Sequence, residues 1–376
     1  MMARLEEICA INMGQSPDSS TYNEDGNGLP FFQGNADFGE IYPAVRMWCS
    51  EPTKIAREKD ILISVRAPIG ALNIASCECC IGRGLAALTV NEDICAQEYL
   101  WHALSGKVDE LNSKGTGSTF KAINKKTLSE TEIPLPPIDE QRKIAAILDK
   151  VSDLIAKRRQ QLDKLDEMVK ARFVEMFGDV IQNTKLWPQY IFSDITTSRL
   201  GKMLDAKQQT GMCQYPYLAN FNVQWFRFEL DNLNEMDFNE ADRIEFELRD
   251  GDLLVCEGGE IGRCAVWHNE IQPCYFQKAL HRVRCKKEIV LPDYLAWWFK
   301  YNCDNKGFAA IEGAKATISH LPGAKLKALL VSVPPIEQQK QFATFVEQTE
   351  KSKTTISRSL EKLETLKKAL MQEYFG

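Results

Sequence analysis

Residues 136–141 read Pro-Pro-Ile-Asp-Glu-Gln, and the pattern returns 198 positions later, at residues 334–339, as Pro-Pro-Ile-Glu-Gln-Gln. The match extends without a gap, because residues 116–178 align with residues 314–376 and both segments end in Phe-Gly. A period of this length is too large for a solenoid unit. It indicates two copies of a domain, each followed by a long segment of its own.

Each Pro-Pro pair marks the start of a predicted helix. Proline disfavours helix in the residue before it and fits the first helical turn. Acidic residues follow at Asp139, Glu140 and Glu337, where the helix dipole favours negative charge. An unbroken helix from Asp139 to Phe177 would be about 58 Å long at 1.5 Å per residue, and Gly178 suits its C-terminal cap.

Apolar residues recur at three- and four-residue spacing along both predicted helices, and charged residues fill the other faces. Each apolar stripe must pack against another apolar surface, and the stripe of the other helix is the obvious partner. We therefore expect an antiparallel intramolecular coiled coil; the alternative is that each helix packs only on its own domain. The first stripe comprises Ile144, Ile147, Val151, Leu154, Leu162, Leu165, Val169 and Met176, and the second comprises Phe342, Val346, Ile356, Leu360, Leu363, Leu366 and Leu370.

The segments before the helices mix strand and helix patterns in the same order. Strands are predicted at residues 29–32, 60–65 and 85–90, and a helix at residues 97–104. Matching features return in the second half: residues 252–255 correspond to residues 60–63, Gly201 corresponds to Gly14, and Tyr294-Leu295 corresponds to Tyr99-Leu100. Between these anchors the halves share little, as expected for one scaffold carrying different loops.

The predicted fold class is α+β. Two similar mixed α/β domains are separated by two long antiparallel helices that form a coiled coil, with an internal pseudo-two-fold repeat. The predicted boundaries are 1–138 for the first domain, 139–179 for the central helix, 180–336 for the second domain and 337–376 for the C-terminal helix.

Composition sets limits on function. The 376 residues suffice for two or three domains, and the net charge of −6 predicts that this chain alone binds DNA weakly. No apolar run approaches membrane-spanning length and the N-terminus is acidic, so we expect a cytoplasmic protein without membrane contact. Residues 77–80 read Cys-Glu-Cys-Cys, but no second Cys pair or nearby His completes a metal site, and we expect reduced, buried cysteines.

These features together resemble the specificity (S) subunit of type I restriction-modification systems. The resemblance covers the whole chain and is carried by residues 134–141, their partial repeat at residues 333–339, the Gly-Ser-Thr-Phe-Lys-Ala-Ile loop at residues 117–123, the strand at 60–65 and the paired long helices. Each motif alone is weak, but their repeated order is specific.

The resemblance implies two target-recognition domains, each reading one half of an interrupted double-stranded DNA site. It implies that the helices set the spacing and bind two methylase (modification) subunits, with or without motor-nuclease (restriction) subunits. No cofactor is expected in this chain: S-adenosylmethionine would bind to the methylase, which modifies adenine at N6, and ATP and Mg²⁺ to the nuclease. The expected methylase interface comprises Ile144, Val151, Leu162, Leu165, Ile356, Leu360 and Leu363.

The sequence predicts no catalytic residue. It contains no Walker A loop, no dinucleotide fingerprint and no adenine-methylase motif. A short nuclease-like match joins Asp293 to residues 304–306, but Asp293 begins an aromatic helix-like segment, so convergence on one metal is not expected.

Reading bases requires paired donors and acceptors on loops, and binding phosphates requires cations, hydroxyls and backbone N–H groups. Two loops in each half, with Arg66 and Lys202 as secondary candidates, meet these needs. The predicted DNA-binding residues are Gln33, Asn35, Arg66, Lys114, Ser118, Thr119 and Lys121 in the first half, and Lys202, Asn220, Asn222, Gln224, Lys315 and Thr317 in the second.

Two alternatives stay open at this level. One is a fused restriction-modification enzyme that cuts or methylates alone, and the other is a coiled-coil tether that does not bind DNA. The target bases, their spacing and the presence of a nuclease subunit are also open.

Overall fold

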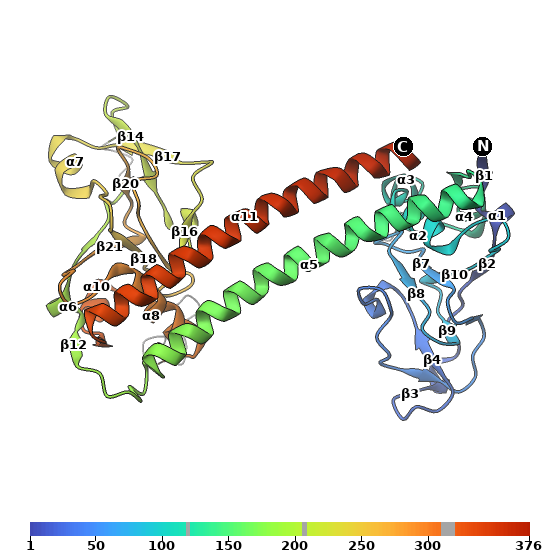
Figure 1. The fold of residues 1–376 in the computed structure, drawn as a ribbon, viewed down its shortest axis with the longest axis horizontal. Helices are drawn as coiled ribbons and strands as arrows, with labels where there is room; N and C mark the ends of the chain where they lie inside the picture. The colour runs from blue at the N-terminus through green and yellow to red at the C-terminus, as the bar shows by residue number, and fades with distance from the viewer. Residues whose placement is uncertain (118–120, 205–208, 310–319) are drawn as a thin grey trace. The chain divides into compact units, whose positions relative to one another are not determined.

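The computed structural model describes residues 1–117, 121–204, 209–309 and 320–376. The chain forms two compact units: unit 1 is Met1–Gln161 with Ile356–Gly376, and unit 2 is Leu162–Thr355. Two 40-residue helices, α5 (Ile138–Phe177) and α11 (Ile336–Phe375), each contribute one part to each unit (Figure 1). The predicted long helices are thus confirmed, and Gly178 ends α5 with a positive φ of 72°.

Unit 1 is built around a four-stranded antiparallel sheet with the strand order β2-β10-β7-β8. Alternate residues of its central strands enter two different cores: Ile63 and Leu88 pack on the helical side, and Leu62 and Ala87 on the other. Both faces of this sheet are therefore covered. The strands are β2 (Cys9–Met13), β7 (Ile61–Ser64), β8 (Leu72–Ile74) and β10 (Leu85–Val90).

An outer sheet covers the second face in unit 1. Its order is β3-β5-β4-β9-β6, and β4 runs parallel to β9 with Phe32 opposite Ile81. The strands are β3 (Tyr22–Asn23), β4 (Leu29–Phe32), β5 (Trp48–Cys49), β6 (Ile55–Ala56) and β9 (Cys79–Ile81). The remaining elements of the first half are β1 (Met2–Arg4), α1 (Leu5–Ile8), η1 (Ser19–Thr21), η2 (Asn35–Asp37), α2 (Gln97–Ser105), α3 (Val108–Ser113), α4 (Lys125–Ser129) and β11 (Glu132–Pro134).

Unit 2 repeats the first sheet with the order β13-β21-β18-β19. Gly14 and Gly201 begin the turn after equivalent strands, and a Cβ at either would collide with a carbonyl oxygen, that of Gly82 or Gln277. Only glycine fits there. The strands are β13 (Thr196–Leu200), β18 (Leu253–Cys256), β19 (Cys264–Val266) and β21 (Leu280–Cys285).

The outer part of unit 2 differs from that of unit 1. It has a three-stranded sheet, β17-β14-β20, and a separate hairpin, β15-β16. The strands are β14 (Gln214–Leu218), β15 (Val223–Gln224), β16 (Arg227–Phe228), β17 (Asn234–Asp237) and β20 (Tyr275–Phe276). The other described elements are β12 (Gln189–Ile191), α6 (Phe192–Ile195), η4 (Asn220–Asn222), α7 (Glu240–Phe246), α8 (Pro292–Asp304), α10 (Gly323–Lys327) and β22 (Leu330–Ser332).

A buried glutamine fixes the start of each long helix. Gln141 accepts a hydrogen bond from the Ala96 backbone N–H (2.9 Å) and donates to the carbonyls of Ile94 (3.1 Å) and Pro136 (2.8 Å). Gln339 repeats this arrangement: it accepts from Leu291 N–H (2.8 Å) and donates to the carbonyls of Ile289 (3.0 Å) and Pro334 (2.7 Å). The Gln of the repeated sequence pattern is therefore a structural residue that satisfies three buried backbone groups.

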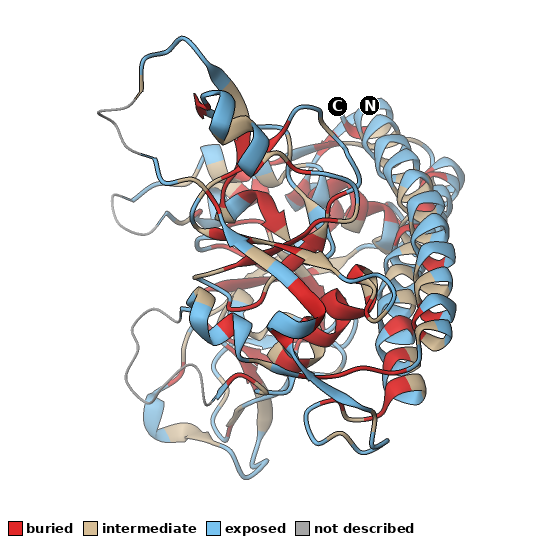
Figure 2. Cartoon of the chain, turned by 90° about the vertical axis from the view of Figure 1, so that its left-hand side faces the viewer, coloured by how far each residue is buried: buried red, intermediate tan, exposed pale blue. Residues whose placement is uncertain are grey.

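The C-terminal end of each long helix packs in the core of the unit that holds the other helix's start. In unit 1, Phe375 of α11 lies 5.2 Å from Tyr99 of α2, between ring centroids. In unit 2, Phe177 of α5 lies 5.0 Å from Tyr294 of α8. Figure 2 shows these helices mostly exposed, with buried residues at intervals along them.

Within each unit the helix parts run antiparallel. Arg159 pairs with Glu364 in unit 1 (2.7 Å), and Lys353 pairs with Asp166 in unit 2 (2.8 Å). Residues of both predicted stripes share a core in each unit, Ile144 with Leu370 in unit 1 and Val169 with Phe342 in unit 2. Three other stripe residues are exposed: Ile147, Leu154 and Leu366. Among the described residues, no helix is long and apolar enough to span a membrane.

Candidate nucleic-acid interface

The parallel strand at the centre of each outer sheet leads into a single turn of 3₁₀ helix. In unit 1, η2 follows β4, and the Asp37 carboxylate accepts the backbone N–H groups of Gln33 (2.8 Å) and Gly34 (3.4 Å). These bonds leave Gln33 exposed and Asn35 half-buried at the protein surface. Both predicted DNA-binding residues of this loop therefore lie on one ordered turn.

Unit 2 repeats this turn as η4 after β14. Asn222 occupies the place of Asp37: its Oδ1 accepts from Ala219 N–H (2.9 Å) and its Nδ2 donates to Glu229 O (2.9 Å). Only 1% of Asn222 is exposed. Its prediction as a DNA contact was wrong, because its amide is used to hold the turn and cannot reach a base.

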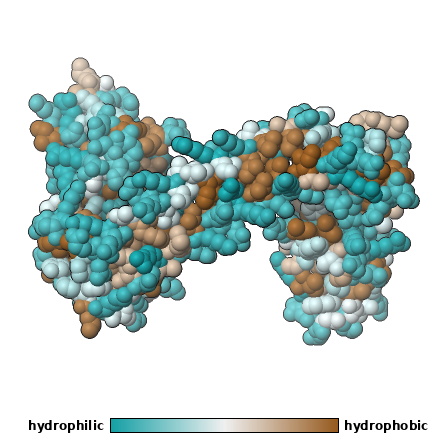
Figure 3. Space-filling model, viewed as in Figure 1, coloured by the Kyte–Doolittle hydropathy of each residue, from teal (hydrophilic) through white to brown (hydrophobic). Residues whose placement is uncertain are grey.

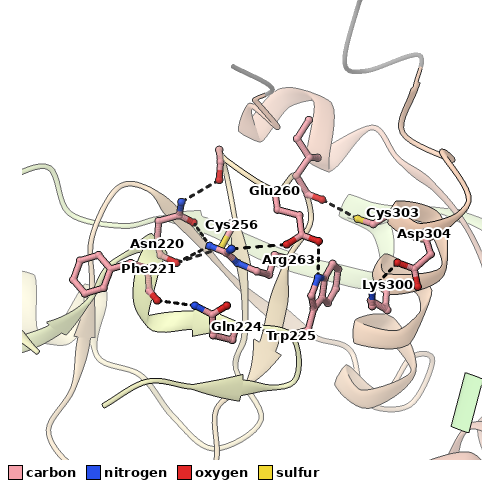
Figure 4. A network of polar contacts seen from close by, with 12 residues as sticks. Asn220, Phe221, Gln224, Trp225, Cys256, Glu260, Arg263, Lys300, Cys303 and Asp304 are labelled. Atoms are coloured by element: carbon pink, nitrogen blue, oxygen red, sulfur yellow. Dashed lines mark hydrogen bonds and ion pairs between the residues drawn. The ribbon is translucent and has the colours of Figure 1, made fainter. Parts of the chain in front are cut away.

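Asn220 begins this turn and belongs to a polar network (Figure 4). Its Nδ2 donates to Gly258 O (3.1 Å), and its carbonyl accepts from the Arg263 guanidinium (3.0 Å). Glu260 lies 3.8 Å from Arg263 and accepts a hydrogen bond from Trp225 Nε1 (2.7 Å). The network makes Asn220 a half-buried, oriented side chain.

Two neighbours of Asn220 are more accessible. Phe221 is 53% exposed, and Figure 4 shows its ring pointing away from the network. Gln224 is half-buried and donates from Nε2 to Phe221 O (2.9 Å), leaving its Oε1 without a described hydrogen bond. Sequence reasoning missed Phe221, although an aromatic residue between two Asn residues in a turn is an available signal, since its ring can contact a thymine methyl group in the major groove.

The second predicted loop of unit 1 adjoins the first sheet through backbone contacts. Arg66 forms a bridge with Ala122, and Ala67 N–H donates to Lys121 O (3.0 Å). Arg66 and Lys121 are both exposed, so the two cations share one edge. Ser118 and Thr119 lie outside the described residues, as do Lys315 and Thr317 in unit 2.

Lys114 is exposed but already paired. It lies 2.6 Å from Glu110, which also contacts Lys107 at 2.9 Å. The hydrogen bond from Lys114, then that from Lys107, lowers the pKa of the Glu110 carboxyl. A phosphate at Lys114 would compete with this carboxylate.

The prediction of Lys202 as a DNA contact needs correction. Its ammonium donates to the Asp242 carboxylate (2.6 Å) and to Asp237 O (2.5 Å), and lies 5.0 Å from the Phe238 ring centroid. Its side chain is only 15% exposed. Lys202 therefore stabilises the outer sheet of unit 2 and does not present a free charge to DNA.

The predicted methylase interface also needs correction. Ile144 and Val151 are buried in unit 1, where Ile144 joins the core under α2. A partner cannot contact Ile144 without displacing that core, and Val151 is too little exposed to form a contact surface. Leu162, Leu165, Ile356, Leu360 and Leu363 are half-buried along the helices.

The exposed apolar residues of the helices lie elsewhere. They include Ile147 (43% exposed) and Leu366 (46%) in unit 1, and Met168 (43%) in unit 2, where Met168 and Phe345 line a shallow cavity. Figure 3 shows hydrophobic side chains gathered along these helices.

The residues described contain no cluster of three or more His, Cys, Asp or Glu that could hold a metal ion. Asp293 lies at the start of α8 and Asp304 at its end, so the nuclease-like pair cannot converge. Burial raises the pKa of Asp293, and Asp304 pairs with Lys300. Cys79 and Cys80 are buried in β9, and burial raises their thiol pKa to about 12 and about 11.

Comparison with known proteins decides the family. A family model described as type I restriction modification DNA specificity domain matches residues 1–166 and 185–367. The chain belongs to this family. The two matched regions correspond to the two halves of the repeat, and the family description agrees with the predicted DNA-recognition role.

Named relatives agree. The MjaX type I restriction enzyme specificity subunit of Methanocaldococcus jannaschii is 44% identical over 165 residues, covering 44% of this chain and 39% of that relative's length. The EcoBI specificity subunit of Escherichia coli is 22% identical over 92% of this chain and 78% of its own length. A crystal structure of the type I S subunit from M. genitalium matches over 100% of this chain and 96% of that chain with a TM-score of 0.58 at 13% identity, which supports the fold.

Proposed function

We propose that this chain is the DNA-reading subunit of a type I restriction-modification complex, and that each domain reads one half of an interrupted double-stranded site. The observation that carries this proposal is the 3₁₀ turn that follows the parallel strand in both units. Each turn is braced by the side chain at its third residue, Asp37 or Asn222, and begins with an Asn. Exposed side chains on an ordered turn suit recognition of base edges in the major groove.

The two turns differ in chemistry. In unit 1 the turn carries Gln33, Asn35 and Ala36, whereas in unit 2 it carries Asn220 and Phe221, with Gln224 beyond it. Different side chains on one frame would read different half-sites, so the expected target is asymmetric. The helices α5 and α11 would set the number of base pairs between the halves.

We further propose that two methylase subunits bind, one to each unit. Met168 of α5 and Leu366 of α11 are separated by the repeat offset of 198 residues, as are Ile147 and Phe345. Ile147 and Leu366 in unit 1 therefore occupy the same repeat positions as Phe345 and Met168 in unit 2. Equivalent surfaces would bind equivalent partners.

No cofactor is assigned to this chain. S-adenosylmethionine would bind to the methylase subunits, which would methylate adenine at N6, and ATP and Mg²⁺ to nuclease subunits where these are present. Incubation of the purified chain with S-adenosylmethionine or Mg²⁺ and DNA tests this assignment, because any methylation or cleavage by the chain alone would contradict it.

The recognition proposal is tested by methylation mapping in cells that express this chain with its methylase subunit, compared with cells that lack this chain. The expected result is a two-part adenine motif that disappears without the chain. A stable complex that produces no such motif would contradict the reading role.

The partner proposal is tested with Met168→Glu and Leu366→Glu, each of which adds a charge to one apolar surface. Each single variant should reduce the bound methylase from two copies to one, measured by native mass spectrometry. Lys164→Glu changes an exposed residue of α5 and serves as the control. Retention of two copies by both single variants would contradict these binding surfaces.

A further inference from the structure

A three-residue connection joins the parallel outer strand to the first sheet in each unit. In unit 1, residues 82–84 (Gly-Arg-Gly) link β9 to β10; in unit 2, residues 277–279 (Gln-Lys-Ala) link β20 to β21. Each connection lies beside the candidate reading turn, because its first residue donates its N–H to the strand before that turn. These bonds are Gly82 to Phe32 (2.8 Å) and Gln277 to Leu218 (3.0 Å).

The other backbone hydrogen bonds of the connection also repeat. Gly84 O accepts from Val65 N–H (2.9 Å), and Ala279 O accepts from Glu257 N–H (2.9 Å). The residues before and after Arg83 therefore make the same backbone hydrogen bonds as the residues before and after Lys278. The two cations occupy one structural position despite different neighbours.

Both cationic side chains are exposed. Across residues 1–117, 121–204, 209–309 and 320–376, neither has a hydrogen bond or ion pair from its charged group. Other cations of unit 2 are already paired: Lys202 binds to Asp242, and Arg263 donates to the Asn220 carbonyl. Each unit therefore keeps one unpaired cation at the same place beside its turn.

The position in unit 1 also adjoins other positive charge. Val65 precedes Arg66, which forms a bridge with Ala122 next to the exposed Lys121. In a chain with a net charge of −6, this edge is a local site where a polyanion would be attracted. A cationic side chain that lies beside a candidate reading turn and is fixed to no protein partner suits a backbone phosphate, which positions the protein without reading sequence.

We propose that Arg83 and Lys278 are matched DNA-phosphate contacts, one in each recognition domain, that position each domain on its half-site. This inference rests on the proposed function and adds the residues that orient each reading turn. A lysine and an arginine can replace each other at such a contact because both supply the charge, whereas bidentate reading of guanine requires the arginine fork.

The test uses the complete complex of this chain with its methylase subunits and a duplex carrying the mapped motif. The dissociation constant is measured from low to high salt for Arg83→Ala, Lys278→Ala, the double variant, Arg83→Lys and Lys278→Arg. Each alanine variant should weaken binding by about 3- to 10-fold and reduce the slope of log K against log salt by about one, because one fewer counterion is released. The double variant should combine both effects, and the conservative variants should bind like wild type.

Lys287→Ala is the matched control. Lys287 is an exposed lysine just beyond the opposite end of β21, so its loss should change neither affinity nor salt slope. Unchanged melting temperatures exclude a general loss of structure.

Three outcomes would overturn the proposal. Alanine variants with wild-type affinity and salt slope would remove the contact, while leaving the DNA-reading role intact. A changed methylated motif in Arg83→Lys would show base reading in place of phosphate binding. A wild-type complex that does not bind an interrupted motif would overturn both this inference and the proposed function.

Discussion

The inner and outer sheets of the molecule differ in how closely the two halves repeat. The inner sheet has the same strand order in both units, β2-β10-β7-β8 and β13-β21-β18-β19. The outer part has five strands in unit 1, but a three-stranded sheet and a separate hairpin in unit 2. The inner sheet packs on the helices that the repeat preserves, whereas the outer part carries the candidate reading turns. One framework can therefore support two different recognition surfaces.

The largest expected effect comes from removing the aromatic ring that closes each inner core. Phe177→Ala and Phe375→Ala should each cost about 3–5 kcal/mol in unfolding free energy, because a buried ring is replaced by a cavity. Phe177 should cost more, since it has ring contacts with Phe173, Tyr294 and Phe342, whereas Phe375 has ring contacts with Tyr99 and Tyr374. Urea unfolding followed by hydrogen exchange in each unit measures this, with the exposed Val174→Ala as control. Equal exchange in both units for either variant would argue against separate, equivalent cores.

The next effect tests whether the buried glutamines are equivalent. Gln141→Leu and Gln339→Leu each leave three backbone groups without their partner, at an expected cost of about 2–4 kcal/mol. The two losses should agree within about 1 kcal/mol because the hydrogen bonds match. Thermal unfolding measures both, and Gln160→Leu on the exposed face of α5 is the control. A loss of stability for only one of the two variants would contradict the equivalence of the two glutamines.

A smaller effect is expected where the halves differ. Phe221→Ala should weaken DNA binding by about 1–2 kcal/mol and alter only the half-site read by unit 2, because the exposed ring beside Asn220 can contact a thymine methyl group in the major groove. The equivalent position in unit 1 is Ala36, so Ala36→Phe is the reciprocal variant. Methylation mapping and titration of the complex measure both. A change in the half-site of unit 1 caused by Phe221→Ala would contradict the assignment of one turn to one half-site.

The smallest effect concerns a contact found only in unit 1. His102 Nε2 lies 2.7 Å from Asp149 Oδ1, yet burial lowers the His102 pKa more than this hydrogen bond raises it, and Lys367 lowers it further. The folded-state pKa is therefore below the unfolded value of about 6.5. The neutral ring contributes stability above that value, and this contribution is lost as pH falls through the folded pKa.

Wild type should accordingly lose more stability than His102→Gln between pH 7 and pH 5, by up to about 1 kcal/mol. Melting temperatures measured across this range test the difference. Parallel pH profiles for the two proteins would show that His102 does not titrate in this window.

The sequence predicted the framework well because its signals are local and repeated. Proline pairs, acidic first turns and apolar periodicity located both long helices, and α5 begins one residue before the predicted Asp139. The strands at Leu29–Phe32 and Leu85–Val90 and the helix from Gln97 were also confirmed. Each depends on neighbouring residues whose preferences agree with the fold.

The candidate interface was predicted less well because side-chain availability depends on distant partners. Lys202 and Asn222 have the right chemistry for DNA, but Asp242 binds the first and the Glu229 carbonyl accepts from the second. Ile144 and Val151 belong to an apolar stripe, yet the structure buries them within unit 1. Arg83 was missed because only the matching hydrogen bonds on either side of it and Lys278 place both cations in one frame.

The sequence by itself determined the duplication, the long helices and the family, since these follow from repeated order and local pattern. Tertiary structure alone decided which polar side chains are available at the surface. Folding assigns each buried donor and acceptor a partner, and those contacts join residues that the sequence keeps far apart. What is left unpaired beside each turn, Arg83 and Lys278 among the described residues, is therefore a property of the folded domains.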